Sequence, residues 1–84
     1  MKTVTFYHSA LCPRCQMASR SISALLPDYP GIQIERVEYL TNLKRARQAG
    51  VRTIPALVDE EGGLKGFYLT KASIRGYFDA LTKG

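Results

Sequence analysis

Apolar residues recur along this chain in two rhythms, and each rhythm predicts a different kind of element. Residues 3–7 are rich in β-branched and aromatic side chains, which is typical of a strand. After Pro13, which suits a first helical turn, apolar residues recur every three or four positions and predict an amphipathic helix. The core-facing stripe of this helix consists of Cys15, Ala18, Ile22, Leu25 and Leu26. Two prolines and a glycine within residues 27–31 end the helix.

The middle of the chain predicts a second strand and then a short second helix. Apolar residues fall on both faces of the strand 32–39, which indicates that helices cover it on both sides. These residues are Ile32 and Ile34 on one face, and Val37 and Tyr39 on the other. Thr41 or Asn42 then caps a short helix that stops at Gly50. The apolar positions of this helix are Leu43, Ala46 and Ala49.

The last third of the chain predicts a hairpin followed by a helix. Residues 55–58 form a third strand, 59–63 a turn, and 64–69 a fourth strand that returns antiparallel. Thr70 caps the last helix, whose core positions are Ile74, Tyr77, Phe78 and Leu81. The element order is therefore β-α-β-α-β-β-α, and its β-α-β start implies parallel pairing. This order predicts an α/β fold with a four-stranded mixed sheet flanked by three helices.

Length and composition describe one small domain, residues 1–84. No segment approaches the roughly 18 apolar residues of a membrane helix, so we expect no membrane contact. The first residues lead directly into a strand and show no secretory pattern, so we expect a cytoplasmic protein. We also expect a monomer.

The net charge of +5 comes partly from a basic cluster around the second helix. Its members are Lys44, Arg45, Arg47 and Arg52. Such a cluster attracts anionic partners. No base-stacking aromatic residues are interleaved with it, so we interpret it as a solvated helix face and expect no nucleic-acid partner.

The only two cysteines, Cys12 and Cys15, enclose Pro13 and Arg14 at the predicted start of the first helix. Free N–H groups and the positive end of the helix dipole favour a thiolate at that place. Closing so small a ring would stabilise the fold by only about 2 kcal/mol, so the pair suits disulfide exchange better than a structural role. Arg14 either favours the thiolate through its charge or points to solvent.

These motifs resemble those of the thioredoxin superfamily, and of its small glutaredoxin branch in particular. The resemblance covers nearly the whole chain. It rests on residues 6–15, which contain the C-P-R-C motif, and on residues 51–55, which end in T-I-P. The resemblance implies a thioredoxin-like fold in which Cys12 is the nucleophile and Cys15 resolves the mixed disulfide.

The resemblance also implies a substrate ledge opposite the dithiol. Pro55 would follow a cis peptide bond and face the two thiols, and the backbone of Ile54 would pair with the cysteine portion of a bound thiol substrate. The substrate-binding residues implied in this way are Pro13, Arg14, Thr53, Ile54 and Pro55.

The function implied is that of a dithiol–disulfide oxidoreductase that reduces protein or small-molecule disulfides, in electron transport and cell redox homeostasis. It would need no resident cofactor, and glutathione or a thioredoxin reductase would recycle it. Two alternatives stay open. The same cysteines could bind a metal ion or an iron–sulfur cluster, although His8 is the only histidine available as a further ligand. The domain could also be a non-enzymatic interaction module that uses its basic helix.

Two departures from the glutaredoxin pattern bear on the substrate. Ser9 stands where glutaredoxins usually carry a lysine for the carboxylates of glutathione. Residues 69–73 replace the Gly-Gly that usually opens the last helix. We therefore expect a protein-disulfide reductase with poor dependence on glutathione.

Overall fold

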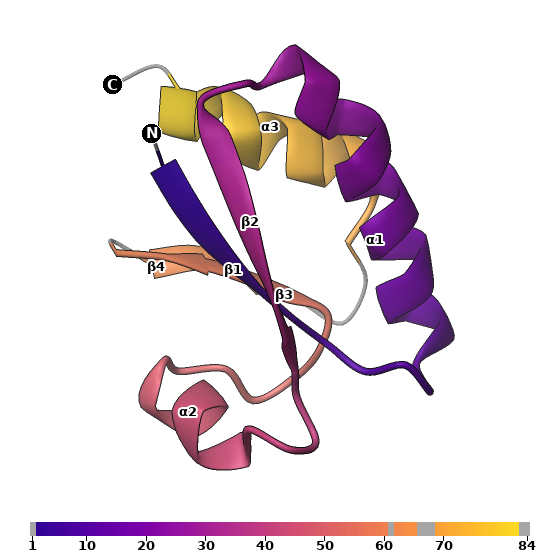
Figure 1. Cartoon of the computed structure of the whole chain (residues 1–84), viewed down its shortest axis with the longest axis vertical. Helices are drawn as coiled ribbons and strands as arrows, with labels where there is room; N and C mark the ends of the chain where they lie inside the picture. Colours follow the sequence, from indigo (N-terminus) through magenta and orange to yellow (C-terminus); the bar gives the residue numbers. More distant parts are fainter. Residues whose placement is uncertain (1, 61, 66–68, 83–84) are drawn as a thin grey trace.

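The computed structural model describes residues 2–60, 62–65 and 69–82 (Figure 1). Its elements follow the predicted order β-α-β-α-β-β-α, with one turn of 3-10 helix, η1, after the first α-helix. The strands are β1 (Lys2–His8), β2 (Ile32–Glu38), β3 (Ala56–Asp59) and β4 (Gly62–Lys65), and the helices are α1 (Pro13–Leu25), η1 (Leu26–Asp28), α2 (Leu43–Gln48) and α3 (Lys71–Thr82). None of the helices in this described part has the length and apolarity needed to cross a membrane.

The four strands form one mixed sheet in the order β2-β1-β3-β4. β1 runs parallel to β2, so that His8 at the end of β1 pairs with Glu38 at the end of β2. β3 runs antiparallel to β1, and its first residue, Ala56, pairs with Tyr7. The ends of β1 and β2 and the start of β3 therefore meet at one end of the sheet, and the loops that leave these strands lie near one another.

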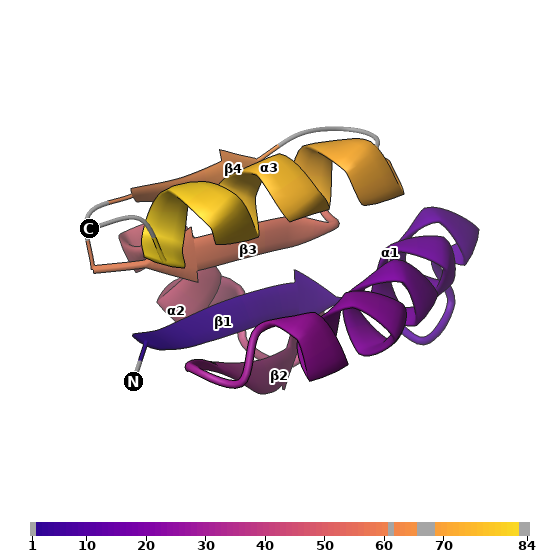
Figure 2. The same cartoon turned by 90° about the horizontal axis from the view of Figure 1, so that it is seen from above.

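Helices cover both faces of the sheet, as the two-sided apolarity of β2 predicted. α1 and α3 lie on one side and α2 lies on the other (Figure 2). We call these sides the α1–α3 face and the α2 face. The core of the α1–α3 face comprises Val4, Phe6, Ala18, Ile22, Leu25, Tyr29, Ile32, Leu57, Leu69, Ile74 and Phe78. The core of the α2 face comprises Tyr7, Val37, Ala46, Val51 and Ala56.

The fourth strand begins earlier than the sequence predicted, because two glycines assigned to the turn pair in the sheet. Gly62 lies opposite Asp59 and Gly63 lies opposite Val58. A Cβ atom at position 63 would fall 2.0 Å from the carbonyl oxygen of Leu57, so only glycine permits this close approach of the two backbones. Leu69 lies outside β4 and is buried. Residues 66–68 of the predicted strand lie outside the described residues.

The two predicted helix caps have different outcomes. The hydroxyl of Thr70 accepts a hydrogen bond from the N–H of Ser73 at 3.1 Å, which confirms Thr70 as the cap of α3. Asn42, one of the two predicted capping residues, is the N-cap residue of α2, but its side chain forms no capping hydrogen bond. Its side-chain amide instead donates to the carbonyl oxygen of Glu38 at 2.8 Å, and this contact ties α2 to the end of β2.

Candidate active site

Cys12 is the N-cap residue of α1, immediately after the loop that leaves β1. Its backbone is extended, and its sulfur accepts a hydrogen bond from the N–H of Cys15 at 3.2 Å. Pro13 begins the helix, where a missing N–H leaves no intrahelical bond unmade. The sulfur of Cys12 thus takes the place of the side-chain oxygen that usually caps a helix, at the positive end of the helix dipole.

The two thiols lie in different environments, and both are free in this structure. Cys12 is 9% exposed and Cys15 is 1% exposed. Burial works against ionisation of Cys12, but hydrogen bonds from Cys15 and the charge of Arg14 outweigh it, so the pKa of Cys12 lies below its ordinary value. Burial, and then the hydrogen bond with Cys12, raises the pKa of Cys15 well above its ordinary value. Cys12 is therefore the thiol that ionises first.

Arg14 lies between the thiols and is partly buried. Its positive charge lowers the pKa of both Cys12 and Cys15. Of the two roles considered for this side chain, these observations favour support of a thiolate over a side chain fully in solvent.

Ser9 begins the tight turn that leads to Cys12, and its side chain faces inward. It is 4% exposed, and its hydroxyl accepts a hydrogen bond from the N–H of Leu11 at 3.3 Å. Its carbonyl oxygen accepts a second from the N–H of Cys12 at 3.1 Å. Ser9 therefore shapes the loop from within, and its hydroxyl is not displayed to a bound ligand.

Ala10, in the same turn, is held from two sides. Its N–H donates to Oε1 of Glu38 at 3.2 Å, and its carbonyl oxygen accepts from the side-chain amide of Gln16 at 2.9 Å. The second carboxylate oxygen of Glu38 accepts from the N–H of Leu40 at 3.3 Å. The hydrogen bond from Ala10 is the main cause that lowers the pKa of Glu38, against an opposing effect of burial. One carboxylate thus joins the loop before Cys12 to the loop after β2.

Sequence reasoning missed Glu38 and Gln16. No motif marks either residue. The carboxylate of Glu38 reaches the loop only because the parallel register places it beside His8, and a register is a property of the assembled sheet.

The predicted substrate ledge lies at the same end of the sheet. The peptide bond between Ile54 and Pro55 is cis, as the resemblance implied. Pro55 is buried, Ile54 is half-buried and Thr53 is exposed. These three residues lead directly into β3, whose first residue pairs with β1 just before the dithiol loop. That Pro55 faces the thiols stays a prediction.

Comparison with known proteins identifies the fold. No family model and no curated protein matches the chain. Thioredoxin O2 from Arabidopsis thaliana, in the oxidized state, superposes with a TM-score of 0.77 at 20% identity, covering 96% of this chain and 75% of that one. Mitochondrial thioredoxin 3 from Saccharomyces cerevisiae gives 0.73 at 21% identity, with 93% and 77% covered. An uncharacterized thioredoxin-like protein from Clostridium perfringens gives 0.70 at 21%, with 96% and 71% covered. The fold is thioredoxin-like.

A metal site at the dithiol of this thioredoxin-like domain would need ligands in addition to the two thiols. Among the described residues, no group of three or more His, Cys, Asp or Glu side chains is placed to hold a metal ion. The ring of His8 stacks on Phe6, with 5.1 Å between ring centroids. Two thiols supply half of the ligands of a tetrahedral zinc site.

Proposed function

We propose that this protein is a dithiol–disulfide oxidoreductase that reduces protein or small-molecule disulfides. One observation carries the proposal: the sulfur of Cys12 accepts the N–H of Cys15 at a helix start, and the pKa values of the two thiols move in opposite directions. A dithiol reductase needs one cysteine that attacks as a thiolate and a second that stays protonated until the mixed disulfide has formed. The two cysteines differ in this sense.

The reaction has two exchange steps. In the first, the Cys12 thiolate attacks one sulfur of the substrate disulfide. A bond forms between Cys12 and that sulfur, the substrate S–S bond breaks, and the other substrate sulfur leaves as a thiolate that takes up a proton. In the second step, Cys15 loses its proton and attacks the sulfur of Cys12. The Cys12–Cys15 disulfide forms, the second substrate thiol departs, and two electrons have passed from the protein to the substrate.

The raised pKa of Cys15 suits its role in the second step. Part of that rise comes from the hydrogen bond with Cys12 and from the charge of Cys12. Both causes disappear once Cys12 is joined to substrate in a neutral disulfide. Burial, the largest cause, remains, but the pKa of Cys15 falls in the mixed disulfide, and this favours attack by Cys15 at the step when resolution requires it.

The oxidised protein needs two electrons from a reductant, and we propose a thioredoxin reductase over glutathione. The inward-facing Ser9 offers no charge to a glutathione carboxylate, and Leu69 and Thr70 stand where a glycine pair would open the last helix. The sequence motifs nevertheless resemble the glutaredoxin branch. We propose that the substrate lies against Pro13, Arg14 and the segment 53–55, and that the protein acts as a cytoplasmic monomer in cell redox homeostasis.

The decisive experiment compares Cys12→Ser with Cys15→Ser on a peptide with one internal disulfide. Cys12→Ser should abolish turnover. Cys15→Ser should accumulate a mixed disulfide that intact-mass spectrometry detects and dithiothreitol removes. Alkylation of the reduced wild-type protein at pH 6 should label Cys12 first. Faster labelling of Cys15, or turnover by Cys12→Ser, would refute the assignment of roles.

The electron donor is tested separately with the wild-type protein. Turnover of the same peptide is followed with glutathione and glutathione reductase, and then with a thioredoxin reductase. We expect faster recycling by the thioredoxin reductase. Efficient turnover with glutathione alone would identify a functional glutaredoxin.

A further inference from the structure

A groove of about 300 Å³ opens between α2 and the segments that join it to β2 and β3. Its lining residues are Tyr39, Leu43, Arg47, Val51 and Arg52. Tyr39 follows β2 directly, and its N–H donates to the carbonyl oxygen of His8 at 2.7 Å. Because His8 ends the strand that leads to Cys12, the groove lies at the dithiol end of the sheet.

Exposed leucines also lie on α2 and on the loops at this end of the sheet. Leu43 and Leu40 are 45% and 54% exposed, and Leu11, the residue before Cys12, is 85% exposed. The carboxylate of Glu38 accepts from the N–H groups of both Ala10 and Leu40, so the two loops that carry Leu11 and Leu40 are neighbours. Large apolar side chains exposed on neighbouring loops are typical of a protein-binding surface.

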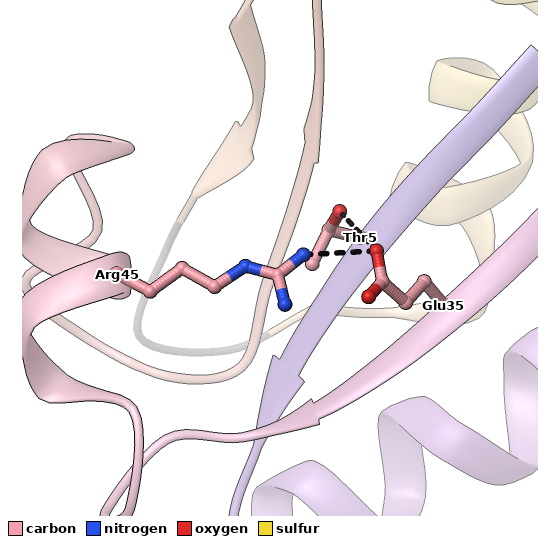
Figure 3. A network of polar contacts seen from close by, with 3 residues as sticks. All are labelled: Thr5, Glu35 and Arg45. Carbon is pink, nitrogen blue, oxygen red and sulfur yellow. Dashed lines mark hydrogen bonds and ion pairs between the residues drawn. The ribbon is translucent and has the colours of Figure 1, made fainter.

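Two cations accompany the apolar surface. Arg47 and Arg52 line the groove and are exposed, and within the described part of the chain neither forms an ion pair. Arg45, on the same helix, behaves differently. Its guanidinium pairs with Glu35 at 2.9 Å, and Glu35 also accepts a hydrogen bond from Thr5 (Figure 3). Arg45 is therefore paired with a carboxylate of the protein itself, whereas Arg47 and Arg52 are exposed to a binding partner.

We propose that this groove binds a segment of a disulfide-bearing protein substrate in which carboxylates flank a large apolar side chain. The inference rests on the proposed reductase function and names its substrate class. The apolar side chain would cover Leu43, and the carboxylates would contact Arg47 and Arg52. Buried apolar contact supplies affinity, and complementary charge supplies steering and register.

The position of Arg52 links this groove to the chemistry. Arg52 immediately precedes the segment 53–55, which we propose as the substrate ledge. A chain seated in the groove could therefore pass its cysteine to the ledge within a few residues. A nucleic acid fits this groove less well, because bases need exposed aromatic rings to stack on. The one aromatic residue that lines the groove is Tyr39, which is half-buried and donates its hydroxyl to the carbonyl oxygen of Arg52 at 3.5 Å.

The test uses three peptides with the same disulfide and one leucine beside it, flanked by two glutamates, two glutamines or two lysines. We expect kcat/KM for the glutamate peptide to exceed that for the glutamine peptide by roughly tenfold at low salt. The lysine peptide should be the poorest substrate. The preference should shrink in 1 M salt, where the Debye length falls to about 3 Å.

Matched double variants test whether Arg47 and Arg52 cause the preference for the glutamate peptide. Arg47→Gln with Arg52→Gln should bring the glutamate and glutamine peptides to equal kcat/KM. Arg20→Gln with Arg75→Gln removes the same charge from exposed positions of α1 and α3 and should keep the preference. Leu43→Ser should lower kcat/KM for all three peptides by the same factor. Loss of the preference in the Arg20/Arg75 variant, or its survival in the Arg47/Arg52 variant, would overturn the inference.

A binding measurement separates this inference from the proposed function. A fluorescent glutamate peptide with both cysteines replaced by serine is titrated with the protein, and anisotropy is recorded. Equal reduction of all three peptides with no such binding refutes the groove and leaves the reductase standing. Binding that depends on Arg47 and Arg52, with no reduction of any peptide, refutes the reductase and leaves the groove standing. Displacement of the peptide by a lower concentration of single-stranded oligonucleotide would overturn the choice of a protein partner.

Discussion

Among the described residues, eleven buried side chains pack the α1–α3 face of the sheet, whereas five pack the α2 face. The first face is covered by helices of 13 and 12 residues, and the second by one helix of 6 residues. Cys15 lies on the buried side of α1, so the reactive pair is supported by the thicker core. The thinner face leaves part of α2 uncovered, and the groove lies there. Rigid support and open surface are thus divided between the two sides of one sheet.

The polar contacts of the two faces differ in the same direction. On the α1–α3 face, the hydroxyls of Tyr29 and Tyr77 donate to Asp79 and Asp59 from partly buried positions. On the α2 face, Arg45 and Glu35 pair with about half of each side chain exposed. Hydrogen bonds shielded from water contribute more to stability than exposed ion pairs do. The comparison therefore predicts an order of effects.

The largest effect is expected from emptying the thicker core. Phe78→Ala removes a fully buried ring that packs edge-on against Tyr29, and should lower the free energy of unfolding by roughly 3–5 kcal/mol. Val51→Ala, in the core of the α2 face, removes two methylene equivalents, worth about 1.6 kcal/mol. Urea unfolding measures both, and Phe78→Leu serves if the alanine variant does not fold. Equal losses at the two sites would remove the distinction between the faces.

A second effect should appear in alkaline solution. Burial, and then the hydrogen bond to Asp59, raises the pKa of Tyr77 above its ordinary value. Because the folded state holds this proton more tightly, the stabilisation is complete below about pH 10 and is lost as the pH rises toward the folded pKa. Tyr77→Phe should lose about 1 kcal/mol at pH 7 and show a shallower decline above pH 10. Parallel declines in urea midpoint for the two proteins would contradict this account.

Substitution of Glu38 tests the contact between the loop before Cys12 and the loop after β2. Glu38→Ala removes the acceptor for the N–H groups of Ala10 and Leu40 and should loosen the turn before Cys12. We expect the pKa of the Cys12 thiol to rise and its alkylation rate at pH 6 to fall by about two- to fivefold, the scale of a helix-terminus interaction. Thiolate absorbance at 240 nm against pH gives the pKa directly. Glu35→Gln removes a carboxylate from the same strand and is the matched control.

Acid should reproduce part of this effect in the wild-type protein. The pKa of Glu38 is lowered in the folded state, so its contribution to stability is present above the ordinary carboxyl pKa and is lost as the pH falls through the folded value. Urea midpoints measured from pH 6 down to pH 3 should therefore fall less steeply for Glu38→Ala than for the wild type. An identical acid profile would show that the contact does not contribute.

The smallest effect is expected from the ion pair in Figure 3. Glu35→Gln breaks the contact with Arg45 at the surface of the α2 face, where water and salt screen both charges. The urea midpoint should stay within experimental error of the wild type. A clear loss of stability would mean that this pair, and not the five-residue core, holds α2 in place.

Local periodicity was enough to predict most of this architecture. The element order, the stripe of α1 and the buried positions of α3 follow from spacings of two, three and four residues, which a sequence displays directly. The T-I-P motif marked the cis bond before Pro55 through resemblance alone. Tyr29 escaped prediction, because a tyrosine in a turn becomes a core residue only when α3 packs against it.

Within the candidate site, the sequence predicted the two thiols but not the contacts that hold the loop before Cys12. Cys12 and Cys15 are separated by only two residues, so the sequence alone indicates their chemistry. The contacts of Glu38 and the pairing of Gly63 depend on how strands align, and no local pattern encodes that alignment. The groove residues all lie between Tyr39 and Arg52, and the sequence did not mark them because a helix with one buried residue shows no pattern for a groove beside it.

The capping role of Cys12 gives the protein a thermodynamic link between its redox state and its folding. The interactions of the folded chain that stabilise the Cys12 thiolate also stabilise the dithiol form relative to the disulfide form. In a closed cycle, the reduced and oxidised proteins must then differ in unfolding free energy by the same amount by which folding shifts the reduction potential. Paired urea titrations of the two redox forms would therefore measure how oxidising this fold makes its cysteines, with no substrate present.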